Sequence, residues 1–267
     1  MLLWNLTRGD APLIVNVPHA GRHVPDAIAL RMQPAALGLP DTDWHVDELY
    51  AFAPSAGITL VAATHSRYVV DLNRDPSGEA LYPGADNTEL CPTRTFANDA
   101  IYAQGAEPTT REVDARRAIF FEPYHALLAA EIDRVRERHG YAVLIDGHSI
   151  EAEVPRFFEG RLPDLNLGTG GGTSCDASVQ RLASDIVATA AGFTHVVNGR
   201  FKGGYITRHY GAPDANVHAL QLEMVQACYM DEADPTSFEA ARAAALVRVL
   251  ERLVLALAEW RPRRGAP

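Results

Sequence analysis

The chain alternates short apolar runs with polar segments, and the apolar runs predict buried strands. The clearest run is Ala142–Ile150 (AVLIDGHSI), where four apolar residues lead into Asp146, Gly147 and His148. Runs of apolar and β-branched residues that end beside turn or polar residues are typical of strands in a covered sheet. Similar runs predict strands at Pro12–Pro18, Ile58–Thr64, Thr194–Val197 and Val217–Val225, and an extended segment at Tyr68–Leu72.

Stretches with helical spacing of apolar residues separate these strands. This spacing predicts helices at Asp41–Ala53, Arg111–Arg138, Asp176–Ala191 and Phe238–Trp260, the second of them interrupted at Pro123. Three further segments are expected to be loops, namely Gly78–Thr110, Glu151–Ser174 and Asn198–Gly211. Strands that alternate with helices, with no linker or repeat, predict an α/β fold. We therefore expect one domain over residues 1–267, with a mostly parallel or mixed central β-sheet sandwiched by helices.

Three of the predicted strands carry residues suited to metal and acid–base chemistry. His19 follows the first strand, His148 ends the central one, and Glu223 lies within the last. In α/β sheets ligands collect outside the carboxyl ends of strands, so these residues are expected at one edge. Two neutral imidazoles and one carboxylate form a catalytic zinc set that leaves a position for water. The competing interpretation is a structural histidine beside a turn aspartate, with Glu223 in a core salt bridge.

Charge adds a second indication. The segment Ser66–Arg74 places Arg67 and Arg74, an aspartate and an asparagine among apolar residues. Arginine forks bind carboxylates in a bidentate manner, although a surface ion-pair strand would have the same composition. The whole chain carries a formal net charge of −10, which argues against nucleic acid or an anionic membrane as a partner. A small anionic substrate would therefore be held by a few local arginines, and no oligomeric state is predicted.

The cysteines and the ends of the chain give weaker information. Cys91, Cys175 and Cys228 are widely spaced and form no CxxC pair, so neither a disulfide framework nor a thiolate zinc site is indicated. Cys175 lies in glycine-rich surroundings, which leaves open a cysteine hydrolase, but a small buried thiol is the simpler interpretation. The N-terminus has no signal-peptide pattern and no apolar run is long enough to span a membrane. We expect a cytoplasmic protein.

Seven segments, in chain order, resemble the N-formylglutamate amidohydrolase (N-formylglutamate deformylase) family. They are PLIVNVPHAGRHVPD, DTDWHVDELY, SRYVVDLNRDP, LIDGHS, DLNLGT, KGGYITRHYG and LQLEM, and the similarity runs from about Pro12 to Glu232. The family is distantly similar to zinc carboxypeptidases and aspartoacylases, so the resemblance implies their fold, an α/β sheet between helices. It also implies metal-dependent hydrolysis of N-formyl-L-glutamate to formate and L-glutamate, the last step of a histidine degradation route.

The resemblance assigns roles to individual residues. It places metal ligands at His19 and His148, the general base at Glu223 and a carbonyl- or carboxylate-binding arginine at Arg67. The zinc carboxypeptidases carry their acidic ligand three residues after the first histidine, and this chain has Arg22 there. We therefore expect the acidic ligand of the single zinc ion to be Asp47, with Asp43 or His45 as alternatives. The residues expected to bind the substrate carboxylates are Asn73, Arg74, Tyr205, Thr207 and Arg208.

Two other functions are compatible with the same residues. One is a zinc amidohydrolase that acts on another N-acyl amino acid, because the sequence does not give the volume of the acyl pocket. The other is a carboxylate-binding protein that keeps the fold without catalysis. The presence of His19, His148 and Glu223 together argues against a pure binder, which needs no such trio.

Overall fold

The computed structural model describes residues 2–80, 84 and 86–262. In this part of the chain, seven strands form one mixed sheet in the order β1-β3-β2-β4-β7-β5-β6. They are β1 (Trp4–Thr7), β2 (Leu13–Val17), β3 (Thr59–Ala63), β4 (Ala142–Ile150), β5 (Leu165–Gly168), β6 (His195–Val197) and β7 (Val217–Val225). The central strands β3, β2, β4 and β7 are parallel, whereas β1 and the β5–β6 pair run antiparallel to them. The predicted α/β fold with a mixed central sheet is confirmed.

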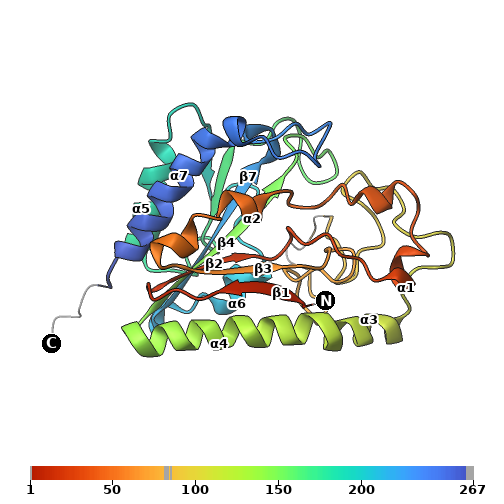
Figure 1. Ribbon diagram of the computed structural model, residues 1–267, viewed down its shortest axis with the longest axis horizontal. Helices are drawn as coiled ribbons and strands as arrows, with labels where there is room; N and C mark the ends of the chain where they lie inside the picture. The colour runs from red at the N-terminus through yellow and green to blue at the C-terminus, as the bar shows by residue number, and fades with distance from the viewer. Residues whose placement is uncertain (1, 81–83, 85, 263–267) are drawn as a thin grey trace.

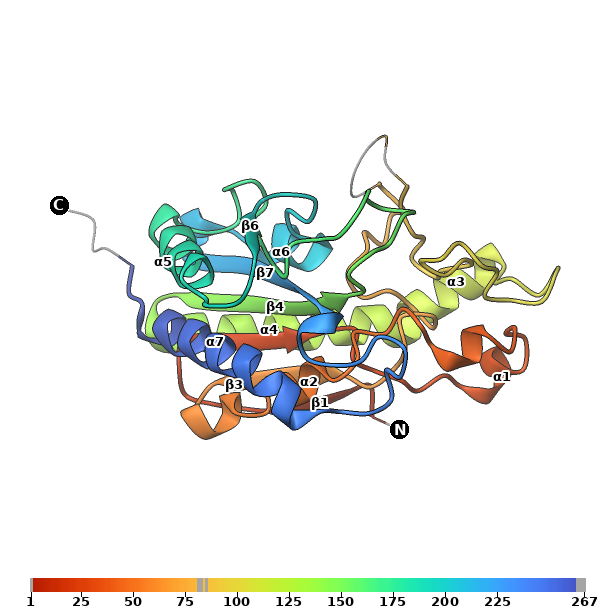
Figure 2. The ribbon, with the colours of Figure 1, turned by 90° about the horizontal axis from the view of Figure 1, so that it is seen from above.

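Helices cover both faces of this sheet, as Figures 1 and 2 show. The longer ones are α3 (Thr110–Arg116), α4 (Glu122–His139), α5 (Ala177–Ala188), α6 (Tyr205–Tyr210) and α7 (Ala240–Glu259). Single turns form α1 (Asp26–Ala29), α2 (Val46–Leu49) and the 3₁₀ segments Ala36–Gly38, Ala53–Ala56, Pro213–Ala215 and Gln226–Cys228. None of the described helices combines the length and apolar character that crossing a membrane would require.

Alternate residues of the strands pack into two separate hydrophobic cores. Leu13 and Val15 of β2 join the core covered by α5 and α7, whereas Ile14 joins the core covered by α4. All nine residues of β4 and all nine of β7 are buried. Parallel strands covered on both faces are expected to be continuously apolar, so polar residues within β4 and β7 require a partner or a function.

Most predicted elements occur with shifts of one to three residues at their ends. Several predicted segments differ more from the structure. The segment Asp41–Ala53 forms only the single turn α2, because His45 adopts a left-handed conformation with φ of 60° just before it. Two elements lie in segments that we expected to be loops, β5 within Glu151–Ser174 and α6 within Asn198–Gly211. Tyr68–Leu72 forms turns rather than a strand.

Pro123 does not break its helix as expected. The chain continues from α3 to α4 through a π-helical turn, Arg117–Phe121, which lies immediately before the proline. A π turn widens the hydrogen-bond ladder, and Pro123 takes a position in the first turn of α4, where its missing N–H is tolerated. Figure 1 shows α3 and α4 as one long rod below the sheet.

Candidate active site

A pocket with about 610 Å³ of empty space, part of it open to solvent, lies beyond the carboxyl end of β2 and along the last residues of β4. In parallel α/β sheets this edge is where ligands bind. Loops that are distant in sequence contribute the remaining wall. The lining residues are His19, Arg67, Asn73, Arg74, Asp86, Asn87, Thr88, Phe96, His148, Ser149, Ile150, Phe157, Arg200, Phe201, Gly204, Gln221 and Glu223. The expected loop Gly78–Thr110 thus contributes to the pocket, although its residues 81–83 and 85 lie outside the described residues.

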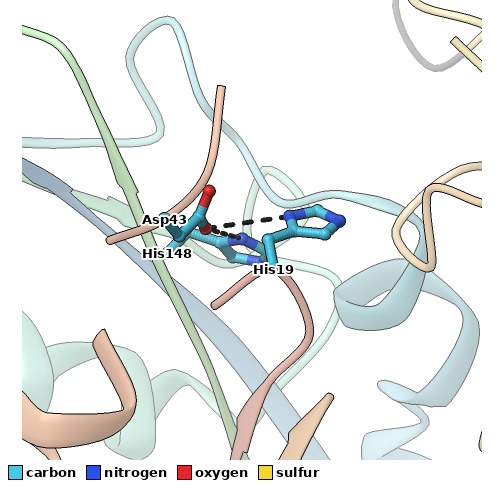
Figure 3. A group of neighbouring side chains, drawn as sticks. All are labelled: His19, Asp43 and His148. Carbon is cyan, nitrogen blue, oxygen red and sulfur yellow. Dashed lines mark hydrogen bonds and ion pairs between the residues drawn. The ribbon is translucent and has the colours of Figure 1, made fainter. Parts of the chain in front are cut away.

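Beside this pocket, His19, Asp43 and His148 form a compact buried group (Figure 3). Oδ2 of Asp43 lies 3.0 Å from Nδ1 of His148 and 3.7 Å from Nδ1 of His19. Nδ1 of His19 is buried and has no hydrogen-bond partner. One donor atom from each residue lies within 4.8 Å of the others. A buried imidazole nitrogen without a partner, next to a second imidazole and a carboxylate, fits the donor set of a divalent metal site.

The other nitrogen of each histidine contacts a buried carboxylate. Nε2 of His19 lies 2.8 Å from Oδ1 of Asp71, and Nε2 of His148 lies 2.8 Å from Oδ2 of Asp146. A carboxylate at Nε2 holds a proton on that nitrogen and leaves Nδ1 as the metal-binding atom. We did not predict from the sequence that Asp71 and Asp146 would contact the two histidines. The signal for Asp146 was present, because a residue two positions before His148 lies on the same face of a strand.

The structure groups Asp43, not Asp47, with the two histidines. The backbone N–H of Asp43 donates to the carbonyl of His19 at 3.1 Å, which holds the Asp43 carboxylate beside the imidazole. Asp47 lies in α2 and lines a separate surface hollow with Arg22. The helix predicted over Asp41–Ala53 would place these two acids, four residues apart, on one face, but the left-handed His45 separates them.

The alternative ligand His45 is also directed elsewhere. Its Nδ1 contacts Glu48 and its Nε2 contacts the carbonyl of Pro235, both at 2.8 Å. Of the three candidate ligands, Asp43 is the one that lies beside both histidines.

Arg67 neutralises much of the negative charge around the histidines. Its guanidinium pairs with Oδ1 of Asp43 and lies 3.9 Å from Asp71. It also stacks over the ring of Phe96, with 4.9 Å to the ring centroid. Although burial opposes ionisation, Arg67 and the two histidines hold the pKa of Asp43 well below its usual value. Asp43 is thus ionised, as a metal ligand has to be.

Glu223 lies opposite His148 on the neighbouring strand β7 and lines the pocket. Its Oε2 accepts a hydrogen bond of 2.9 Å from Gln221, whose own Oε1 accepts one of 2.7 Å from the N–H of Gly204. Burial raises the pKa of Glu223 to about 7. A carboxylate with this pKa can take up and release a proton at neutral pH.

Asn73 and Arg74 also line the pocket. Oδ1 of Asn73 accepts a hydrogen bond of 2.8 Å from the N–H of Ile206, and its Nδ2 lies 3.0 Å from Nε2 of His148. Arg74 donates through Nε to Thr88 at 2.8 Å and lies 3.8 Å from Asp71. Asn73 therefore fixes the start of α6 against the histidine, while Arg74 contributes positive charge.

Three expected substrate-binding residues are not among those that line this pocket. Tyr205 and Arg208 line a separate open hollow with Asp75, and Thr207 is fully buried. They belong to helix α6, where we expected a loop, and in this helix Tyr205 and Arg208 line the other hollow while Thr207 is buried. The same segment instead contributes Arg200 and Phe201 to the pocket, which the sequence analysis missed.

Cys175 is buried and is not among the lining residues. Burial raises the pKa of its thiol to about 12, with a further contribution from Asp176. A thiol of this kind is a poor nucleophile, which favours the buried structural role over a cysteine hydrolase.

Comparisons with known proteins agree on one family. The family model of N-formylglutamate amidohydrolase matches residues 11–230. An N-formylglutamate deformylase of Pseudomonas putida is 44% identical over 253 residues, which cover 95% of this chain and 94% of that protein. A protein of the same name from Pseudomonas aeruginosa is 44% identical over 259 residues, 97% of each chain. The crystal structure of N-formylglutamate amidohydrolase from Ralstonia eutropha JMP134 superposes with a TM-score of 0.80 at 28% identity, over 97% of this chain and 98% of that one.

Proposed function

The chain belongs to the N-formylglutamate amidohydrolase family, and we propose that it hydrolyses N-formyl-L-glutamate to formate and L-glutamate. The observation that carries the proposal is the buried group of His19, Asp43 and His148 beside Glu223, in a pocket lined by arginines. Relatives that are 44% identical and are named N-formylglutamate deformylase support the choice of substrate.

We assign a divalent metal ion, zinc in the first instance, to Nδ1 of His19, Nδ1 of His148 and the carboxylate of Asp43. Two imidazoles and one carboxylate are a donor set found in catalytic zinc sites. When bound, such an ion polarises a carbonyl group and lowers the pKa of a water molecule towards neutrality. The carboxylates of Asp71 and Asp146 support the assignment, because each faces the nitrogen that is turned away from Asp43.

Glu223 is the proton carrier in this proposal. It accepts a proton from the water that attacks the formyl carbon, and it delivers that proton to the amide nitrogen as the C–N bond breaks. One water is consumed, and the products are formate and the free amino group of L-glutamate. The hydrogen bond from Gln221 holds the Glu223 carboxylate in one orientation throughout.

Arg67 and Arg74 bind the oxygen atoms of the substrate. Arg67 lies against Asp43, so its guanidinium is placed to donate to the formyl oxygen as negative charge develops there. Arg74 lies one residue beyond Asn73 and carries a positive charge at the pocket wall, which suits the α-carboxylate. Because both arginines are already fixed by carboxylate or hydroxyl partners, little reorganisation is needed on binding.

Formate release tests the proposal. The protein is assayed with N-formyl-L-glutamate as purified, after chelation and after zinc is restored, with N-acetyl-L-glutamate as the comparison substrate. We expect activity on the formyl compound that is lost on chelation and recovered with zinc. Activity that survives complete chelation would contradict the metal assignment. Preference for the acetyl compound would favour an amidohydrolase for another N-acyl amino acid.

A further inference from the structure

We propose that Arg200 binds the side-chain carboxylate of the substrate and so makes the pocket selective for a dicarboxylic N-formyl amino acid. This inference rests on the proposed function, because it concerns the same pocket. It adds a specificity residue that the sequence motifs do not indicate.

The guanidinium of Arg200 is fixed on two sides. Its Nε donates a hydrogen bond of 2.7 Å to the carbonyl of Phe157, and its plane lies over the ring of Phe201, with 5.4 Å to the centroid. Phe157, Arg200 and Phe201 all line the pocket. A planar guanidinium held in this way loses little freedom when it binds a carboxylate.

The other charges of the pocket point to Arg200. Among the described lining residues there are three arginines, of which Arg67 pairs with Asp43 at the catalytic group. Arg74 lies next to Asn73 and is assigned to the α-carboxylate. The lining acid Asp86 is balanced by two hydrogen bonds from Arg156, at 2.8 and 3.0 Å. A substrate with two carboxylates needs a second cationic partner, and we assign that role to Arg200 because it lines the pocket beside Phe157 and Phe201.

The wall of the pocket suits the rest of such a side chain. Phe96 and Phe157 pack edge to face, with ring centroids 5.0 Å apart, and both line the pocket together with Ile150 and Phe201. These apolar surfaces can cover the two methylene groups of a glutamate side chain. The chain therefore offers an apolar wall next to a fixed cation, which is the pattern needed for an aliphatic carboxylate.

Arg208, the arginine expected from the sequence, is in the wrong place for this role. It lies on α6 and lines the open hollow that also contains Asp75 and Glu79. Those two acids repel an anionic ligand. Within the segment 198–211, Arg200 is the arginine that reaches the catalytic pocket.

The test compares N-formyl-L-glutamate with N-formyl-L-glutamine, which replaces the side-chain carboxylate by an amide of similar size. Both are assayed on zinc-loaded wild type, Arg200→Gln, Arg200→Lys and the control Arg161→Gln. Arg161 pairs with Asp164 on an exposed surface and is not among the residues that line the pocket. We expect Arg200→Gln to lower kcat/KM for the glutamate substrate about 10- to 100-fold and to change the glutamine substrate less than about threefold. Arg200→Lys should recover part of the loss, and Arg161→Gln should match wild type.

Binding of L-glutamate and L-glutamine, measured by calorimetry on the same proteins, separates the two proposals. If wild type hydrolyses both substrates but Arg200→Gln keeps the wild-type preference or loses both activities equally, Arg200 is not the specificity residue and the proposed function stands. If wild type hydrolyses neither substrate yet binds glutamate selectively, and Arg200→Gln removes that selectivity, the role of Arg200 stands and the proposed function fails. Equal binding of both amino acids to wild type overturns the role of Arg200.

Discussion

Oδ2 of Asp146 lies 2.8 Å from Nε2 of His148, on the opposite side of the ring from Asp43, which lies 3.0 Å from Nδ1. Asp146 is fully buried, and its Oδ1 accepts a hydrogen bond of 2.8 Å from Asn16. Asn16 in turn accepts one of 2.7 Å from the hydroxyl of Tyr124. This chain of hydrogen bonds holds the Asp146 carboxylate beside Nε2 of His148, where it can accept the proton of that nitrogen.

Replacing Asp146 by Asn should weaken metal binding more than it weakens the fold. Without the Asp146 carboxylate, Nε2 would lose its acceptor and face amide NH₂ groups, including that of Asn73 at 3.0 Å, which would place the imidazole proton on Nδ1, the metal-binding atom. We expect zinc affinity, measured by competition with a chromophoric chelator, to fall about 10- to 100-fold. Tyr124→Phe removes only the far end of the chain and should change the affinity less than about threefold. Wild-type affinity in a folded Asp146→Asn protein would show that His148 needs no such partner.

The choice between Asp43 and Asp47 as the acidic ligand can be decided with one pair of variants. Asp43→Asn should reduce zinc affinity and turnover about 100-fold or more, because it removes a donor and takes the nearer of two carboxylates from Arg67. Asp47→Asn should change both by less than about twofold, since Asp47 lines another hollow. Both measurements are made on protein whose far-UV circular dichroism matches wild type. The opposite pattern would restore the ligand expected from the sequence.

The sequence could predict the residues that strands deliver to the sheet edge. Apolar runs locate β2, β4 and β7, and the parallel pairing of these strands in the structure brings His19, His148 and Glu223 to the same region of the sheet. The acidic ligand could not be predicted in this way. The position of Asp43 depends on a hydrogen bond to the carbonyl of His19 and on the left-handed conformation of His45, and neither leaves a periodic pattern.

The residues that we assign to substrate binding were harder to predict than His19, His148 and Glu223. Glycine and arginine in the segment 198–211 indicated a loop, but its second half forms α6, since Asn73 accepts a hydrogen bond from the N–H of Ile206 in its first turn. Arg208 lies on this helix and lines a separate hollow, whereas Arg200 precedes the helix and lines the pocket. Composition identified a segment that contributes to the pocket, but only the tertiary structure shows which of its two arginines lines it.

As the proposed general base, Glu223 should give the reaction a defined pH dependence. A general base acts when it is unprotonated, and burial raises the pKa of Glu223 to about 7, so kcat/KM should rise with pH on the acid side. A bound cation favours the carboxylate, which places the midpoint of the acid limb at or below about 7. Profiles from pH 5 to 9 test this, and Glu223→Gln should lose about 100- to 10,000-fold in kcat. A rate that increases as the pH falls from 8 to 6 would exclude this role.

His125 should make the stability of the fold sensitive to acid. Burial lowers its pKa to about 4, and its ring nitrogens contact the hydroxyl of Tyr210 and the carbonyl of Leu72, both at 2.9 Å. The folded state therefore keeps His125 neutral, whereas in the unfolded chain this histidine binds a proton near pH 6.5. The full stability of the fold is therefore present above pH 6.5, and it declines as the pH falls towards 4. Between pH 7 and pH 5 this linkage amounts to about 2 kcal/mol of the free energy of unfolding.

Urea denaturation of wild type and His125→Gln at both pH values measures this linkage. Glutamine can keep one donor and one acceptor at this site but does not titrate. The variant should therefore lose less stability than wild type between pH 7 and pH 5, by about 2 kcal/mol. His139→Gln is the matched control, because His139 lies at the exposed end of α4. Equal losses in wild type and His125→Gln would show that His125 can be protonated without unfolding, and the acid sensitivity would then belong to other groups.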